Sequence, residues 1–220
     1  MRLRVTAAFL ASSFVFSGAA LAAAPMSFRA AALDTGSCGA HCPAVVIADG
    51  EITEQTPQAF IDFLRANLRK RELRAVVVVN SPGGKVVSSM VLGKIFRKLG
   101  VATIVARADV AGGRAALAPG RCYSACVYAM MGGRTRIVPP PSKVGVHRMF
   151  TYEPGVDPAG GGGRLMRFDD GKMSGVLSRY SRSMGVSGDI VVSAERTPSD
   201  GIHVLTPGEI ARWRLGDKRL

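Results

Sequence analysis

Beyond its first 22 residues, the 220-residue sequence has no long uninterrupted apolar run. A helix that spans a bilayer needs about 20 consecutive apolar residues, so we expect no membrane span in the rest of the chain. Acidic residues are scarce: 16 Asp and Glu stand against 29 Lys and Arg, for a formal net charge of +13. The basic residues are spread along the chain rather than grouped with aromatics, which argues against nucleic acid as a partner. A basic surface can instead make peripheral contact with an anionic membrane surface.

The first 22 residues form a segment of a different kind. Arg2 and Arg4 give a basic start, residues 5–21 are apolar apart from a few Ser and Thr, and Ala20-Leu21-Ala22 follows. This order is typical of a secretory signal peptide with a small-x-small cleavage site. We therefore expect a signal peptide over 1–22, cleaved after Ala22, and a periplasmic or secreted protein. A signal anchor retained in the membrane is the alternative, although the apolar run is short for a span.

Cysteine is also rare, and its spacing is regular. The chain has four: Cys38 with Cys42, and Cys122 with Cys126. An even number of cysteines in an exported protein favours disulfides, but the sequence leaves their pairing open. A zinc site is the alternative, because His41 beside Cys42 offers a further ligand. Export explains the cysteines without zinc, so we expect neither a metal nor a cofactor.

Hydrophobic periodicity divides the remaining chain near residue 44. Residues 23–43 are rich in Ala, Gly and Ser and are expected to form an extended arm, with one domain over 44–220. Within that domain, short apolar runs alternate with helical patterns, which predicts parallel βαβ units and an α/β fold. The expected strands are 44–48, 75–79, 101–106, 136–138, 144–146 and 203–205, and the expected helices are 56–68, 86–99, 124–131, 164–184, 188–195 and one that begins at 206 with a capping box. Residues 107–121 and 154–163 are rich in Gly and are expected to form loops.

Three features suit nucleophilic catalysis by a serine, which needs a base and amides directed at the developing oxyanion. Ser124 stands where a loop becomes a helix, and the free N–H groups of a helix start stabilise an anion. Gly83-Gly84, after a buried strand, can direct backbone amides into a site without side-chain obstruction. His147 directly follows a short strand. Taken alone, each has an ordinary explanation: an N-cap, a strand–helix turn and a surface histidine.

The motifs together resemble a known family. The string Val79-Asn80-Ser81-Pro82-Gly83-Gly84, the serine at a later helix start and Val146-His147 resemble the Clp protease proteolytic subunit and its crotonase-like superfamily. Ile47-Ala-Asp-Gly-Glu51 and Leu205-Thr-Pro-Gly-Glu209 extend the resemblance over residues 44–217. The Cys-x-Ser-Ala-Cys setting of Ser124 is similar to an exported, poorly characterised branch. The resemblance implies stacked ββα units, with a mostly parallel sheet and flanking helices.

The resemblance also implies roles for single residues. Ser124 would be the nucleophile, His147 its base and Asp200 the third catalytic member, while the amides of Gly84 and Ala125 would form the oxyanion hole. A Ser–His dyad without an acid is the alternative. The expected protein is an exported Clp-like serine peptidase or related acyl hydrolase that acts on a peptide or protein substrate, and it can form a homo-oligomer. The chain departs from the family pattern by inserted residues at 111–120 and by four consecutive glycines at 160–163.

Three alternatives stay open. One is a catalytically inactive protein of the same fold that binds peptides or another envelope partner. Another is a crotonase-type acyl-CoA enzyme, which suits the fold but works on a cytoplasmic cofactor. The third is a Ser–Lys dyad, for which Lys143 and Lys172 are the available lysines. The separation of the Ser124 hydroxyl and the His147 ring discriminates between the catalytic and the inactive protein.

Overall fold

The computed structural model describes residues 23–33, 42, 44–67, 73–156 and 162–217. The predicted signal peptide and Cys38 lie outside these residues. None of the helices in the described part of the chain is both long and apolar enough to cross a membrane.

The main sheet has six strands in the order β3-β2-β1-β5-β4-β7. Their bounds are β1 Ser27–Leu33, β2 Ala44–Asp49, β3 Leu73–Asn80, β4 Ala102–Ala111, β5 Arg114–Pro119 and β7 Thr135–Ile137. Strands β2, β3, β4 and β7 run parallel to one another, as the strand–helix alternation predicted. Because β3 also pairs with β4, while β1 pairs with both β2 and β5, the pairings of five strands close into a ring.

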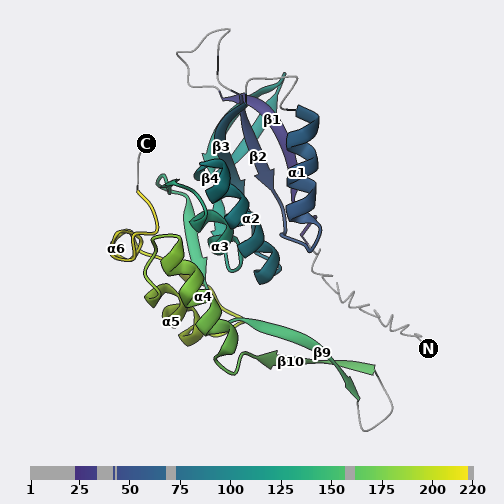
Figure 1. Ribbon diagram of the computed structural model, residues 1–220, viewed down its shortest axis with the longest axis vertical. Helices are drawn as coiled ribbons and strands as arrows, with labels where there is room; N and C mark the ends of the chain where they lie inside the picture. The colour runs from purple at the N-terminus through teal and green to yellow at the C-terminus, as the bar shows by residue number, and fades with distance from the viewer. Residues whose placement is uncertain (1–22, 34–41, 43, 68–72, 157–161, 218–220) are drawn as a thin grey trace, which may run out of the picture.

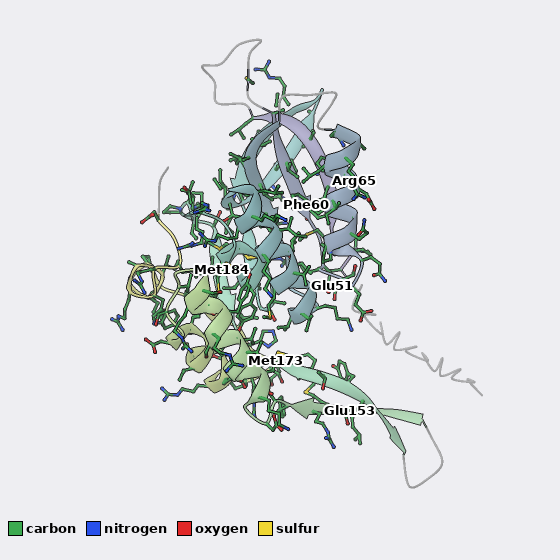
Figure 2. The ribbon with its side chains drawn as sticks, viewed as in Figure 1. Glu51, Phe60, Arg65, Glu153, Met173 and Met184 are labelled. Atoms are coloured by element: carbon green, nitrogen blue, oxygen red, sulfur yellow. A yellow bond between two sulfur atoms is a disulfide. The ribbon has the colours of Figure 1, made fainter. Side chains whose placement is uncertain are left out.

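Both faces of this sheet are buried. Three helices lie on one face of the sheet (Figure 1). They are α1 (Thr56–Asn67), α2 (Val86–Leu99) and α3 (Cys126–Met131). In β3, Val77 and Val79 join the core under the helices, whereas Val78 joins a second core on the opposite face. A strand covered on both sides has an apolar residue at every position, which explains the run of four valines. Figure 2 shows Phe60 of α1 inside the molecule and Arg65 on the outer side of the same helix.

The expected arm at 23–43 contributes a strand to the sheet. Ser27–Leu33 pairs antiparallel with β2 along its length, so the folded domain begins before residue 44. The ring of Phe28 lies 5.1 Å from that of Phe60 and 6.1 Å from that of Phe63. This contact anchors β1 to α1, although the three consecutive alanines of the strand show no strand pattern in the sequence.

The prediction of a loop at 107–121 is wrong, because most of these residues form strands. Strand β4 continues to Ala111, turns at Gly112-Gly113 and returns as β5 in antiparallel register. Ala106, Ala108 and Ala115 point into the second core and Val110 packs against it, whereas Arg107 and Asp109 are exposed. Alanine and glycine have low strand propensity, so the alternation was hidden in the sequence.

The expected helix at 164–184 begins later, and a hairpin precedes it. Strands β9 (Phe150–Val156) and β10 (Gly162–Phe168) pair antiparallel and extend away from the body (Figure 1). Helix α4 covers only Lys172–Ser183. Its start is set by Asp169, whose carboxylate accepts the backbone N–H groups of Met173 and Ser174 and the Ser174 hydroxyl. These bonds satisfy amides that a longer helix would have bonded internally.

A second sheet of three strands, in the order β11-β8-β6, lies below the main sheet. It consists of β6 (Arg121–Tyr123), β8 (Lys143–Val146) and β11 (His203–Val204). Helices α5 (Asp189–Arg196) and α6 (Pro207–Arg212) flank it. The capping box predicted at the start of α6 is confirmed, with Thr206 and Glu209 bonded to each other's backbone amides.

Candidate active site

The site begins at the ends of two neighbouring parallel strands. In the β6–β8 pair, Tyr123 lies opposite Gly145, so Ser124 and His147 leave the sheet at the same edge. Adjacent strands in a sheet are about 4.8 Å apart. The backbone N–H of Ser124 donates to the carbonyl oxygen of Gly145 at 2.8 Å, which fixes the serine against the strand that carries the histidine.

Ser124 lies in a sharp turn between β6 and α3. Its φ of 54° is in the left-handed region, which among the described non-glycine residues only Arg214 shares. This conformation costs an L-residue about 1–2 kcal/mol and is found preferentially at functional sites. Helix α3 begins at Cys126, two residues after the predicted start, so Ser124 and Ala125 belong to the turn. The serine is half-buried, which leaves part of it accessible.

The Gly83-Gly84 turn packs directly against this serine. Both glycines have positive φ, 118° and 129°. A Cβ at position 83 would lie 2.8 Å from the Ser124 Cβ and 3.3 Å from the amide nitrogen of Ala125. Only glycine fits this approach. The turn is fixed by the Ile52 amide, which donates to the Gly83 carbonyl at 2.8 Å.

Two backbone amides near this turn have no described hydrogen-bond acceptor. Neither the Gly84 nor the Ala125 N–H donates a hydrogen bond to any group in the described part of the chain. The neighbouring Gly83 N–H, in contrast, donates to the Ser81 hydroxyl at 3.1 Å. The structure therefore places Ser124 and Ala125 against the Gly83-Gly84 turn, and the predicted role of the Gly84 and Ala125 amides as an oxyanion hole stays a prediction.

His147 is half-buried at the end of β8, and its ring is oriented by its own neighbours. Nδ1 lies 2.9 Å from the carbonyl oxygen of Arg148, and the Phe150 ring lies 6.1 Å from the imidazole. A proton on Nδ1 would donate to that carbonyl and leave Nε2 as the basic nitrogen. Among the described contacts, no hydrogen bond joins the Ser124 hydroxyl to His147.

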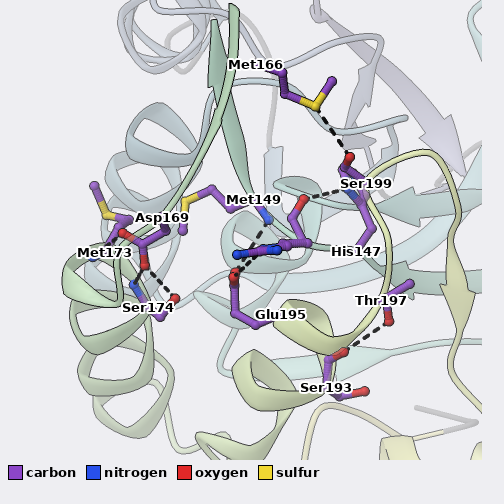
Figure 3. A network of polar contacts seen from close by, with 11 residues as sticks. His147, Met149, Met166, Asp169, Met173, Ser174, Ser193, Glu195, Thr197 and Ser199 are labelled. Atoms are coloured by element: carbon purple, nitrogen blue, oxygen red, sulfur yellow. Dashed lines mark hydrogen bonds and ion pairs between the residues drawn. The ribbon is translucent and has the colours of Figure 1, made fainter.

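The acid that the structure brings toward His147 is Glu195 rather than Asp200. Glu195, on α5, accepts the Met149 N–H at 3.4 Å and pairs with the Arg148 guanidinium at 3.6 Å (Figure 3). Burial raises the pKa of Glu195, while the Met149 amide, Arg148 and His147 oppose that rise. Asp200 is exposed in the turn before β11, and its carboxylate has no hydrogen bond or ion pair within the described residues.

Sequence reasoning missed Glu195 because the family pattern places the acid just before the closing strand. The only available signal was that Glu195 is the acid preceding Asp200 in the chain. Its proximity to His147 depends on how α5 packs against β8, and that packing has no local signature in the sequence.

The two lysines considered for a dyad lie elsewhere. Lys143 begins β8 opposite Arg121, at the end of the strand away from His147. Lys172 is exposed and pairs with Asp170 at 2.9 Å. Neither forms a described contact with Ser124.

A disulfide joins Cys122 to Cys126, one of the pairings that the sequence allowed. Cys38 and His41, the further members of the alternative zinc site, lie outside the described residues. Within the described residues, no group of three or more His, Cys, Asp or Glu side chains is placed to hold a metal ion, and no cysteine is free.

A pocket of about 440 Å³ lies at the base of the β9–β10 hairpin. Its apolar wall and charged rim are formed by Met149, Phe150, Thr151, Arg167, Phe168, Asp169, Asp170, Lys172, Met173 and Val176. Phe150, which lines this pocket, has its ring 6.1 Å from the imidazole of His147.

The sequence matches no protein-family model, and no curated protein matches it. The structure is similar to a mutant of the 1510-N membrane-bound stomatin-specific protease, with a TM-score of 0.51 and 17% identity over 79% of this chain and 78% of that chain. A second mutant of that protease, in complex with a substrate peptide, gives a TM-score of 0.51 and 19% identity over 79% of this chain and 74% of that chain. ClpP1 from Listeria monocytogenes gives 0.50 and 14% over 79% and 89% of the two chains.

These similarities establish the fold. The chain has the fold of the Clp-type proteases, a mixed α/β architecture with a mainly parallel central sheet and flanking helices. The resemblance that the sequence motifs indicated is thereby confirmed at the level of the fold.

Proposed function

We propose that the protein is a serine peptidase or a related acyl hydrolase, with Ser124 as its nucleophile and His147 as its general base. The observation that carries the proposal is the packing of the left-handed Ser124 against Gly83, beside the unbonded amides of Gly84 and Ala125. An ordinary N-cap serine requires neither the positive φ nor a glycine turn from a distant strand. The proteases among the structural neighbours support the same class of reaction.

In the proposed reaction, the Ser124 hydroxyl attacks a substrate carbonyl carbon while His147 Nε2 accepts its proton. The oxyanion that forms is bound by the Gly84 and Ala125 amides. The imidazolium then protonates the leaving group, and a water molecule releases the acyl group with His147 again as the base. The Arg148 carbonyl holds the Nδ1 proton throughout, which is the orienting role that a carboxylate has in a Ser-His-Asp triad.

The proposed substrate is a peptide or protein segment. The pocket at the base of the β9–β10 hairpin has an apolar wall of methionine, phenylalanine and valine side chains, which suits an apolar residue. One structural neighbour was solved in complex with a substrate peptide, which supports this substrate class. The proposed reaction uses only side chains and backbone amides of the chain itself.

Labelling with a fluorophosphonate probe tests the nucleophile, because such probes bond covalently to activated serines. The wild-type protein should be labelled, and Ser124→Ala should lose the labelling completely. Ser27→Ala is a matched control on β1, far along the chain, and should be labelled like the wild type. Equal labelling of Ser124→Ala and the wild type would overturn the assignment.

One observation favours a second candidate function. The Ser124 hydroxyl and His147 share no hydrogen bond, as would suit an inactive protein of the same fold that binds peptides or another envelope partner. Catalytic hydrogen bonds are often long in unliganded enzymes and tighten when the substrate binds. A wild-type protein that resists the probe while binding peptides would support the inactive candidate.

We also propose that the protein is exported by a cleaved signal peptide at residues 1–22. The disulfide between Cys122 and Cys126 supports this proposal, because disulfides persist in oxidising compartments. Expression of the full chain in a bacterial host should yield periplasmic or secreted protein whose first residue is Ala23. Recovery of the uncut chain in the membrane fraction would support a signal anchor instead.

A further inference from the structure

The disulfide brackets the proposed nucleophile symmetrically. Cys122 lies in β6, two residues before Ser124, and Cys126 is the first residue of α3, two residues after it. Both cysteines are 0% exposed and belong to the main core. The reaction proposed above does not use this crosslink, although it spans the turn in which the reacting oxygen is held.

The crosslink restricts the conformations of the three residues that it encloses. A segment of four residue steps can span about 13 Å when extended. The Cα atoms of Cys122 and Cys126 are 5.2 Å apart, and disulfides tolerate only about 4.4–6.8 Å. The enclosed residues 123–125 therefore cannot extend while the disulfide is intact.

Other contacts at the turn are weaker than a covalent bond. The Ser124 N–H donates to the Gly145 carbonyl at 2.8 Å, and its carbonyl accepts the Val127 N–H at 3.1 Å. Each of these is a single hydrogen bond, which makes only a modest net contribution to stability. The left-handed φ of 54° is unfavourable for a serine, so local preference pulls this residue toward other conformations. The disulfide restricts the change of Ser124 to these other backbone conformations.

We propose that the Cys122–Cys126 disulfide is a positioning element for the nucleophile. It holds Ser124 in the left-handed conformation and thereby keeps the hydroxyl beside the Gly84 and Ala125 amides. This inference rests on the proposed function. It assigns to the disulfide an effect on the reactivity of Ser124 that is separate from its effect on folding.

The test is the rate at which a fluorophosphonate inactivates Cys122→Ala/Cys126→Ala. With the nucleophile less well placed, the maximal inactivation rate should fall by about tenfold to a hundredfold. The probe concentration that gives half of that rate should stay unchanged, because the binding surface is intact. Circular dichroism at the assay temperature checks that the variant is folded. Cys38→Ala/Cys42→Ala removes the other two cysteines and should keep the wild-type rate.

A folded double variant that is inactivated at the wild-type rate would overturn the positioning role and leave the proposed function intact. Complete resistance of the wild type to the probe would overturn both. Should the alanine variant be unfolded, the rate is measured on wild-type protein reduced to graded extents with dithiothreitol, and the reduced fraction is determined by mass spectrometry after alkylation. The inactivation rate should then fall in proportion to the reduced fraction of still-folded protein, and a constant rate would contradict the proposal.

Discussion

At the scale of single residues, Glu195 is an acid whose charge interacts with the proposed base. Glu195 interacts with His147 electrostatically, whereas the imidazole Nδ1 lies at hydrogen-bond distance from the Arg148 carbonyl oxygen. In the proposed reaction, this carboxylate supplies a negative charge near the base without setting its tautomer. We expect Glu195→Gln to lower the fluorophosphonate labelling rate by about tenfold, which corresponds to about 1.4 kcal/mol.

Asp200→Asn provides the comparison for this prediction. Asp200 is exposed and has no described partner, so its labelling rate should stay within about twofold of the wild type. A larger loss for Asp200→Asn than for Glu195→Gln would return the role of third member to Asp200, as the family resemblance implied.

The approach of Gly83 to Ser124 gives a second prediction at this scale. In Gly83→Ala, the new Cβ would meet the Ser124 Cβ and the Tyr123 carbonyl while φ stays near 118°. We expect the free energy of unfolding, measured in urea, to fall by about 3 kcal/mol and labelling of Ser124 to be lost. The control is Gly113→Ala, at positive φ but with open space around it, which should cost about 1 kcal/mol and leave labelling intact. Normal labelling of folded Gly83→Ala would show that the close contact is not required.

The contrast between these residues shows what the sequence could predict. Ser124, Gly84 and His147 were predicted because each follows a strand of a recognisable motif, and parallel strands bring such positions to one edge. Glu195 was not predicted, because its place depends on the packing of a helix against a strand 50 residues earlier in the chain, for which no local pattern exists.

At the scale of elements, helix α6 depends on its first turn. Glu209 accepts the Thr206 N–H and the His203 Nε2–H, each at 2.8 Å. The Thr206 backbone bond, followed by the bonds from the side chains of His203 and Thr206, lowers the pKa of Glu209 from 4.5 to about 2. A carboxyl whose pKa is depressed by folding stabilises the protein above its unfolded pKa, and this contribution is lost as the pH falls through the folded value.

The prediction concerns Glu209→Gln, which keeps the capping geometry but removes the titrating group. The variant should be less stable than the wild type at pH 6, and the difference should shrink as the pH falls from 4.5 toward 2. Urea unfolding at a series of pH values measures both free energies. A difference that stays constant over this range would contradict the assigned role of the carboxylate.

Elements with local signals were predicted well, and those held by pairing were not. Helix α2 and strand β3 match the expected ranges closely, because a run of valines and a helical apolar period are local patterns. The β9–β10 hairpin was missed because residues 164–168 fit a helix as well as a strand. Their pairing with residues 150–154 of β9 decides in favour of the strand.

At the scale of the whole molecule, two cores share one sheet, and the second core exists because β1 and β5 close the ring of strands. The proposed site lies where this body meets the smaller sheet and the C-terminal helices. The geometry of the site therefore depends on how stably those helices pack on the main sheet. One arginine of that sheet forms several hydrogen bonds to them.

Arg136, in β7, donates to carbonyl oxygens near the ends of three helices. Its guanidinium bonds Gly133 after α3, Met184 after α4, and both Arg214 and Leu215 after α6, at 2.8–3.3 Å, and it also bonds Met131 at the end of α3 at 3.5 Å. Burial and the charge of Arg97 lower its pKa. The planar fork can satisfy these separated oxygens at once, whereas the ammonium of a lysine cannot.

Replacing this residue tests whether that attachment matters to the whole molecule. Arg136→Lys should leave at least two of these carbonyls without a donor, at a cost of about 3 kcal/mol and about 5–10 °C in the midpoint of thermal unfolding. Arg134→Lys is the control, because the Arg134 side chain is exposed two residues away and should tolerate the change within about 0.5 kcal/mol. Equal midpoints for the two variants would mean that the C-terminal helices are held by their apolar contacts alone. The expected gap would instead show that the hydrogen bonds of Arg136 help to hold α3, α4 and α6 on the sheet.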